Sequence, residues 1–460
     1  MEPEGAALSA SKDTPQLGHY LGHLTAVNQQ RNVIATEDIV NQSGALVARQ
    51  GARIDVATAR RIALHKLAKP LEVQVQIEGT LDKKDIINTL GTLVTEFDDL
   101  KTIEDKLRFQ RDFPGMLQQN INLVLRQKLT VMAVLHPQLL KQTLLGAWLA
   151  TLVARELGLE DTIIHRASMA ALARDLGLLH IAPELLNKKG SFTPPEWRAM
   201  QSHVVIGQLI LKDVAGMHPD IATAVLEHHE RLDGTGYPTG KENEHLGLLG
   251  QILSMADALC SIRFKRFGTT GNHLGDVQPF LLMNSSCYQR SVYDAVCSVL
   301  RKAGLQRTSI NPYGDQQTLL RQLVQRAKDI QHIVPGLNRL VTLLQSLKLG
   351  THTKELTRLV SQTHNIIHSS GIINEEIISW LEGITHEPQP AEIPFLCEMD
   401  LLQSELLWHL NRVRHALAIF LYENNDLAPL ITQELTKLIN SLSDLQTAAC
   451  SLAKNSSGVN

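Results

Sequence analysis

The pattern of apolar and polar positions favours strands only near the start of the chain. Short apolar runs at 33–36 and 45–48 are bounded by glycine and polar residues, as is typical of strands joined by turns. Residues 56–66 have helical spacing, and residues 71–77 alternate apolar and polar side chains with period two, which predicts a half-buried strand. We therefore expect a small N-terminal α/β module over residues 31–80.

Beyond residue 83 the pattern is almost entirely helical. Helical spacing over 86–97 and 118–134 predicts a helical connector, which we place at 81–138. It leads into a helical region over 139–303, where the candidate chemistry lies. Residues 1–30 are polar with no sustained period, and we expect them to form a flexible tail.

The C-terminal part, residues 304–460, has the length and period of a helical bundle, with Pro335 expected to interrupt its first helix. The four predicted helices cover 315–349, 352–384, 396–424 and 427–453. The predicted fold class is therefore mainly α, an all-helical domain with a small N-terminal α/β module and a C-terminal helical bundle.

Composition narrows the class of protein. The 460 residues include 44 Lys and Arg against 47 Asp and Glu, and this near balance argues against a nucleic-acid binder. No apolar run approaches the roughly 18 residues that span a bilayer, and the acidic N-terminus is unlike a signal peptide. The 5 cysteines form no CxxC pair, which fits a reducing compartment. We expect a cytoplasmic protein.

Histidine is unusually dense in one window. Of the 19 histidines, seven lie between residues 165 and 245. Imidazoles and carboxylates from separate helices can converge on a divalent cation. The residues that would supply such a set are Asp175, His203, His228, His229 and Asp257. A lone histidine is more often a packed or surface residue than a ligand, so we expect no metal role for His165, His180, His218 and His245.

A glycine-rich segment follows the paired histidines. Residues 233–238 contain two glycines and a proline and must form a loop. Because the loop comes so soon after His229, it would place backbone amides and Tyr237 beside the candidate metal site.

Together these motifs make residues 139–303 resemble the HD-GYP family of bacterial HD-superfamily phosphohydrolases, whose members hydrolyse cyclic di-GMP. The small module over 31–80 also looks like one that often precedes such domains. The matching residues, in order, are 183–190 (PELLNKKG), Met200, His203, Gly207, 228–231 (HHER), 233–238 (DGTGYP) and Asp257.

The chain departs from the family pattern at one end of the site. The family's first histidine falls on Gln142, its His-Asp pair is Arg174-Asp175, and the lysine that follows is Leu178. A glutamate that some members add falls on Gln138. The resemblance therefore implies that the first of two metals keeps only Asp175 and Asp257.

The second metal set is complete by the same resemblance, with Asp175, His203, His228 and His229 as ligands. We therefore expect one divalent metal such as Fe or Mn, and weak or absent hydrolysis. The catalytic residue is unknown, with Asp175 the best candidate. Arg174 would bring a permanent cation to the stripped position, where it could pair with Asp257 or hold a phosphate.

The resemblance implies further ligand-binding residues, namely Arg174, Arg231, Tyr237 and Arg266. For Arg231 a phosphate contact and a salt bridge to Glu230 or Asp233 both remain open. Cys260 stands where an acidic residue is usual in the family, and we expect it to be a packed thiol.

Three functions stay open at this point. The first is a degenerate HD-GYP regulatory module that binds one metal and a cyclic dinucleotide. The second is a working metal-dependent cyclic di-GMP phosphodiesterase. The third is an interaction scaffold, with protein partners docking on the 233–238 loop or on the bundle. A homodimer through the bundle is a further option, and we expect neither nucleic acid nor membrane as a partner.

Overall fold

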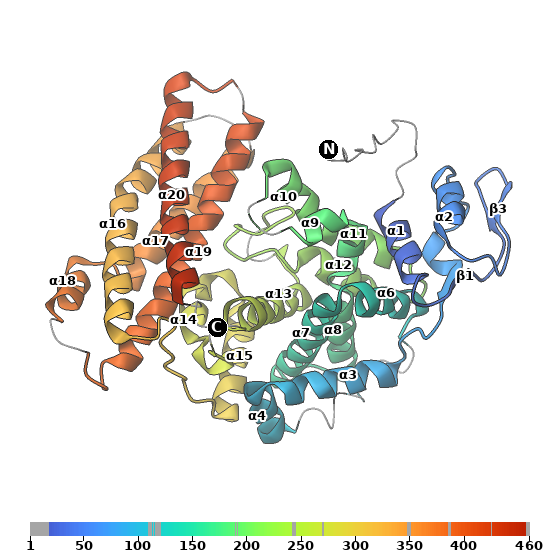
Figure 1. The fold of residues 1–460 in the computed structure, drawn as a ribbon, viewed down its shortest axis with the longest axis horizontal. Coiled ribbons are helices and arrows are strands. Elements are labelled where there is room, and N and C mark those ends of the chain that lie inside the picture. Colours follow the sequence, from blue (N-terminus) through green and yellow to red (C-terminus); the bar gives the residue numbers. More distant parts are fainter. Residues whose placement is uncertain are drawn as a thin grey trace, which may run out of the picture.

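A computed structural model describes most of the chain, and Figure 1 shows its three parts, with the N-terminal module and the C-terminal bundle on opposite sides of the central helices. The described residues are 18–108, 113, 115, 121–188, 190, 192–241, 245–268, 271–346, 351–384, 388–424 and 426–456.

The N-terminal module contains two small antiparallel sheets. Strand β1 (Val33–Ala35) pairs with β4 (Val75–Ile77), and β2 (Ile39–Val40) pairs with β3 (Leu46–Ala48). Helix α2 (Val56–Ala63) lies between β3 and β4 in the chain.

The predicted strand over 71–77 is wrong in its first half. Residues Leu71–Val73 form the 3-10 turn η1, which the backbone N–H of Val73 closes onto the carbonyl of Pro70 at 3.3 Å. Pro70 has a fixed φ that suits a turn, and this local hydrogen bonding outweighs the period-two pattern.

The predicted flexible tail needs correction at its end. Residues 1–17 lie outside the described residues, but helix α1 (His19–Val27) buries four apolar side chains. These side chains, Tyr20, Leu21, Leu24 and Val27, recur at helical spacing and pack into the main core. The short length of the pattern concealed this amphipathic face.

One hydrophobic core runs from Tyr20 to Ala303, so the N-terminal module and the central helices form a single packed unit. The elements of the central region are α3 (Lys83–Glu96), α4 (Asp98–Leu107), α6 (Leu123–Leu135), α7 (Pro137–Glu156), α8 (Asp161–Ala173), η2 (Leu176–His180), α9 (Pro183–Leu186), α10 (Pro194–Gln201), α11 (His203–Lys212), α12 (Pro219–Glu227), α13 (Leu248–Ser261), the π-helical turn η4 (Ile262–Arg266), η5 (Leu274–Asp276), α14 (Gln278–Met283), η6 (Ser285–Cys287) and α15 (Arg290–Ala303).

The bundle has a second core of its own, to which Met283 of the central region also contributes. Pro335 does not interrupt the first helix, because the buried stripe of Ile330, Ile333 and Leu337 continues on both sides of it. The predicted helix over 352–384 is split at Gly371, which adopts a φ of 66°. The helices are α16 (Gln316–Ser346), α17 (Thr351–Ser370), α18 (Glu375–Gly383), α19 (Ile393–Glu423) and α20 (Pro429–Ser456).

Candidate metal centre

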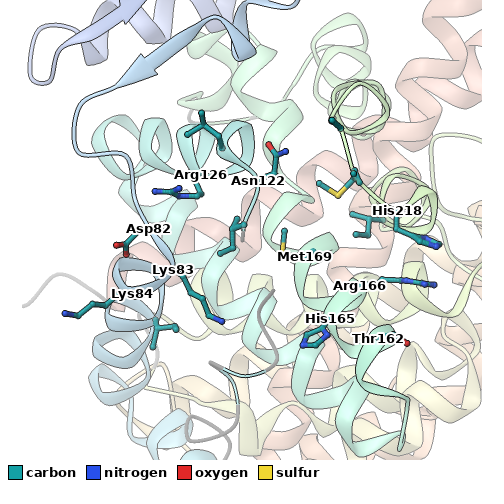
Figure 2. Close-up of a pocket in the computed structure, with 17 residues that line it drawn as sticks. Asp82, Lys83, Lys84, Asn122, Arg126, Thr162, His165, Arg166, Met169 and His218 are labelled. Atoms are coloured by element: carbon teal, nitrogen blue, oxygen red, sulfur yellow. The ribbon is translucent and has the colours of Figure 1, made fainter. Parts of the chain in front are cut away.

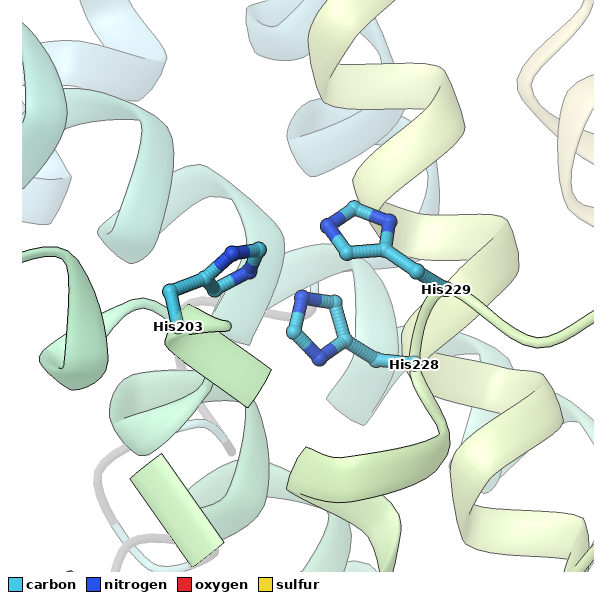
Figure 3. A group of neighbouring side chains, drawn as sticks. All are labelled: His203, His228 and His229. Carbon is cyan, nitrogen blue, oxygen red and sulfur yellow. The ribbon is translucent and has the colours of Figure 1, made fainter. Parts of the chain in front are cut away.

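Three of the predicted ligands, His203, His228 and His229, converge and are called the histidine cluster below (Figure 3). His203 is the first residue of α11, and His228 and His229 follow the end of α12. One ring nitrogen from each residue lies within 4.8 Å of the other two. This spacing suits three ligands of one ion, as the sequence predicts.

Backbone carbonyls orient two of the imidazoles. The Nδ1 atom of His203 lies 2.7 Å from the carbonyl oxygen of Met200, and the Nδ1 atom of His228 lies 2.7 Å from that of Val225. Each Nδ1 must therefore carry the proton, which leaves an Nε2 lone pair. Both Nε2 atoms are buried and make no hydrogen bond to the described part of the chain. An oriented imidazole with a free inward nitrogen fits a metal ligand.

Burial keeps two histidines of the cluster uncharged. It lowers the pKa of His228 to about 4, with a further contribution from His203. Burial also lowers the pKa of His229 well below its usual range, and His228 and His203 add to the effect. Because only a neutral imidazole can donate a lone pair to a metal, His228 and His229 are in their binding form at neutral pH.

A glycine brings His203 into place. A Cβ atom on Gly177 in η2 would lie 2.0 Å from the carbonyl oxygen of His203. Only glycine allows the backbones of η2 and α11 to approach this closely. The same turn follows Asp175, so it fixes the distance between that carboxylate and the histidine cluster.

The other end of the cleft holds Arg174, whose side chain is 1% exposed. Its Nε donates to Oδ2 of Asp175 at 2.9 Å, and its Nη2 lies 3.4 Å from Oδ1 of Asp257. Nη2 also donates to the backbone carbonyl of Gln142 at 3.1 Å. The guanidinium thus bridges the two carboxylates that the resemblance leaves at the first metal position, and we call this arrangement the arginine bridge.

Helix α7 makes room for the arginine bridge. A Cβ atom on Gly146 would lie 1.7 Å from Nη1 of Arg174. Any side chain there would push the guanidinium out of its place. Gly146 and Arg174 are therefore matched to each other across α7 and α8.

Both carboxylates of the bridge also face the histidine cluster. Burial alone would raise the pKa of Asp175, but Arg174, followed by His228 and His203, lowers it below the usual aspartate value. Oδ2 of Asp257 lies 3.8 Å from Nδ1 of His229. Asp175 is therefore ionised, and its carboxylate responds to both the guanidinium and the histidine cluster.

Cys260 is the packed thiol that the sequence predicts, since it is buried in α13. Burial raises its pKa to about 12. It therefore stands beside Arg174 as a neutral group, and the two aspartates are the anions that balance the guanidinium.

The loop after the histidines packs directly on the cluster. The Tyr237 ring stacks on His229 with 4.7 Å between ring centres, and the Tyr237 backbone N–H donates to the His229 carbonyl at 3.1 Å. Asp233 closes the loop by accepting from the backbone N–H of Thr235 at 3.0 Å. The structure thus places Tyr237 beside the histidine cluster, and its role in ligand binding stays a prediction.

The predicted ligand arginines have other partners. Arg231 donates to Oδ1 of Asn284 at 3.2 Å, and among the described residues no ion pair joins it to Glu230 or Asp233. Arg266 forms an ion pair with Glu405 of α19. Both arginines therefore lie at the junction of the central helices and the bundle.

Sequence analysis missed the contribution of α19 to this junction. Glu405, Trp408 and Arg412 all contact the predicted site residues or their loop. Polar residues at 405, 409 and 412 recur at helical spacing, which is the one signal that could have drawn attention to that face. Nothing in the sequence indicates which partner the face meets.

The histidines without an expected metal role lie elsewhere. His165 and His218 line a cavity of about 1190 Å³ together with Lys83 and Arg126 (Figure 2), and this cavity shares no residue with the histidine cluster. His180 lies 2.9 Å from the Nζ of Lys128. No helix in the described ranges is both long and apolar enough to cross a bilayer.

Comparisons with known proteins agree with this geometry. Residues 128–285 match the family model of the HD domain, which begins inside the predicted connector. The chain is 36% identical over 114 residues to a cyclic di-GMP phosphodiesterase of Pseudomonas aeruginosa, covering 24% of this chain and 28% of that protein. This chain contains an HD domain.

Two further relatives are also cyclic-dinucleotide phosphodiesterases. One is a 3'3'-cGAMP-specific phosphodiesterase of Vibrio cholerae, 34% identical over 115 residues, which are 25% of each protein. The other is a cyclic di-GMP phosphodiesterase of Thermotoga maritima, 32% identical over 123 residues, or 26% of this chain and 33% of that one. The chain thus spans about a quarter to a third of the length of these relatives.

Proposed function

We propose that this protein is a signalling protein of the HD-GYP family that binds one divalent metal ion and a cyclic dinucleotide, with little or no phosphodiesterase activity. The observation that carries the proposal is the arginine bridge. A buried guanidinium lies between Asp175 and Asp257, where the family resemblance puts the first of two metals.

The histidine cluster fits a metal, because two buried Nε2 atoms are oriented and unpaired. His203, His228 and His229 would hold the ion, and the family resemblance offers Asp175 as a fourth ligand. A bound divalent ion supplies Lewis-acid polarisation of a phosphoryl oxygen and lowers the pKa of water.

The arginine bridge opposes a second metal. A divalent ion there would have to compete with Arg174 for both carboxylates and would leave that buried cation unpaired. Removing one partner of a buried ion pair typically costs about 3–5 kcal/mol. Arg174 can donate to a phosphate oxygen, but it cannot ionise water.

Loss of the second ion should reduce hydrolysis strongly. Dinuclear phosphodiesterases use two ions about 3.5–4 Å apart to stabilise the attacking and leaving oxygens. Removing one strong electrostatic contact costs about 10²–10³ in rate. A protein that keeps one ion and loses the other should therefore act as a receptor rather than as an efficient enzyme.

The experiment measures metal content and ligand binding on the same purified protein after anaerobic loading with iron or manganese. We expect one ion per chain and calorimetric binding of cyclic di-GMP without turnover. A protein without metal after loading would contradict the metal part of the proposal. Absence of heat in the titration with cyclic di-GMP would contradict the receptor part.

A working phosphodiesterase remains the second candidate, because the histidine cluster is complete. Its test is turnover of cyclic di-GMP to the linear dinucleotide or GMP by the loaded protein. Turnover that disappears in His228→Ala but persists in the matched His218→Ala variant would favour this candidate over the first.

A further inference from the structure

The bundle holds the loop that covers the histidine cluster. Nη2 of Arg412 in α19 donates to the backbone carbonyl of Thr235 at 2.7 Å and reaches Oγ1 of the same residue at 3.2 Å. Arg358 of α17 donates to the carbonyl of Gly234 at 3.4 Å. The bundle is therefore docked on the predicted ligand side of the HD-GYP domain.

Two arginines at this junction share one aromatic ring. The guanidinium carbon of Arg231 lies 5.3 Å from the centre of the Trp408 ring, and that of Arg412 lies 5.1 Å from it. Arg231 comes from the HD-GYP domain, and Arg412 comes from the bundle. The junction therefore brings two cations together from separate parts of the chain.

Neither cation has a carboxylate at ion-pair distance within the described ranges. The acceptors of Arg231 and Arg412 are neutral groups, and the one carboxylate of Asp233 acts on both guanidinium groups from further away. Arg266 differs, because it is paired with Glu405, whose other oxygen accepts from Nδ2 of Asn284 at 2.8 Å.

An unpaired cation pair in a partly buried place is unfavourable, since desolvation and mutual repulsion both oppose the charge. The cost falls on Arg412, because burial, followed by the neighbouring Arg231, lowers the pKa of Arg412 to about 10. Burial also opposes the charge of Arg231, but Tyr288, Cys287 and Asp233 outweigh it and raise the pKa of Arg231. A bound anion would relieve both effects. Guanidinium groups match phosphate oxygens in charge and in donor geometry.

We propose that Arg231 and Arg412 form a binding site for a phosphate-bearing ligand at the junction of the HD-GYP domain and the bundle. The bundle then completes the ligand site instead of being a separate module. Arg231 follows His229 by two residues, and Tyr237 of the loop held by Arg412 stacks on that histidine. A ligand here would border the metal centre.

The identity of the ligand as a cyclic dinucleotide rests on the proposed function, whereas the anion site does not. Calorimetry on the full chain should therefore use two probes in separate titrations, cyclic di-GMP and inorganic pyrophosphate. The test variant is Arg412→Gln, in which the amide can still donate to the Thr235 carbonyl.

The matched control is Glu423→Gln, which removes another contact between α19 and the HD-GYP domain. Glu423 lies 3.2 Å from Arg198 of α10, away from the arginine pair. We expect Arg412→Gln to weaken binding of the probes about 10-fold or more, with unchanged metal content. Glu423→Gln should leave the affinity within about twofold of the wild type, because an exposed ion pair contributes little.

The titrations of Arg412→Gln and the wild type test the anion site and the dinucleotide separately. Unchanged affinity in Arg412→Gln overturns the site, and tighter binding also overturns it because the bundle would then shield Arg231. Heat from pyrophosphate that Arg412→Gln reduces, without heat from cyclic di-GMP, supports the anion site and contradicts the dinucleotide part of the proposed function. No heat from either probe overturns the site, while metal content still tests the metal part separately.

A second variant covers a failure of Arg412→Gln to fold. Arg412→Lys keeps the charge but loses the planar pair of donors. We expect it to bind pyrophosphate about threefold to tenfold more weakly than the wild type. Wild-type affinity in this folded variant would contradict the proposal.

Discussion

The two ends of the cleft differ in how their buried polar groups are satisfied. At the histidine cluster, two Nε2 atoms are oriented by backbone carbonyls behind them and make no hydrogen bond in front within the described chain. At the arginine bridge, Nε and Nη2 of the guanidinium meet two carboxylates and a backbone carbonyl, and only Nη1 is buried without a hydrogen bond to the described chain. One end is prepared for an ion, and the other already contains its own cation.

If the proposed function is right, this difference shows that a protein can lose a metal position without leaving a void there. Arg174 supplies charge where a divalent ion would, and Gly146 supplies the space for it. A lone substitution of histidine by a smaller residue would have left two uncompensated aspartates. The bridge instead pairs both carboxylates with a cation, which favours the fold without a second metal.

Removing a ligand from the histidine cluster should have the largest effect. We expect His228→Ala to lower metal affinity by at least about 100-fold, because a three-histidine site loses one of its donors. The measurement is metal content after loading and dialysis. His218→Ala, an exposed histidine outside the cluster, is the control. Metal retention in His228→Ala would contradict the assignment of the cluster.

Rebuilding the first metal position should let both ends of the site bind a metal. The double variant Gln142→His with Arg174→His supplies two imidazoles and frees Asp175 and Asp257. We expect a second metal per chain and an increase in phosphodiesterase rate of about 100-fold. Gln142→His alone retains the bridge and should gain neither. A second metal in that single variant would show that Arg174 is not the obstacle.

Filling the space behind the arginine bridge should lower the free energy of unfolding by a moderate amount. Gly146→Ala places a Cβ against Nη1 of Arg174, and overpacking of this kind costs about 1–3 kcal/mol. Chemical denaturation would measure the loss in free energy of unfolding. In an Arg174→Ala background the same change should be nearly neutral. Equal losses in both backgrounds would rule out the matched pair.

The smallest predicted effect is the difference in stability between variants of the two bridge carboxylates. Asp257 is 25% exposed in its side chain and lies 3.4 Å from the guanidinium, so Asp257→Asn should cost less than about 1 kcal/mol. Asp175 is 10% exposed and accepts at 2.9 Å, so Asp175→Asn should cost about 1–3 kcal/mol. Denaturation of both variants compares them, and the reverse order would contradict the role given to Asp175.

Sequence alone predicted the members of the histidine cluster, because His228 and His229 lie in the HHER string and His203 matches the same family pattern together with Met200 and Gly207. It also indicated that Arg174 could pair with Asp257. It could not predict that Gly146 receives the guanidinium, since that contact depends on how α7 packs against α8. The helical class followed from the period, whereas helix α1 and the turn η1 were missed because short patterns are weak.

The junction with the bundle lay beyond sequence reasoning for a different reason. Arg412 and Thr235 are 177 residues apart, and nothing local to either residue indicates the other. Amphipathic periodicity predicts that α19 has a buried face, but it does not say which domain that face meets. Only the three-dimensional arrangement joins Arg231 to Arg412.

The central claim is that the cleft holds one metal because Arg174 occupies the place of the other. The most direct measurement is elemental analysis of the fully loaded wild-type protein, combined with anomalous diffraction at the metal edge. We predict one ion per chain, located between His203, His228 and His229, with Arg174 still bridging Asp175 and Asp257. Two ions per chain, with Arg174 displaced from the carboxylates, would contradict the account.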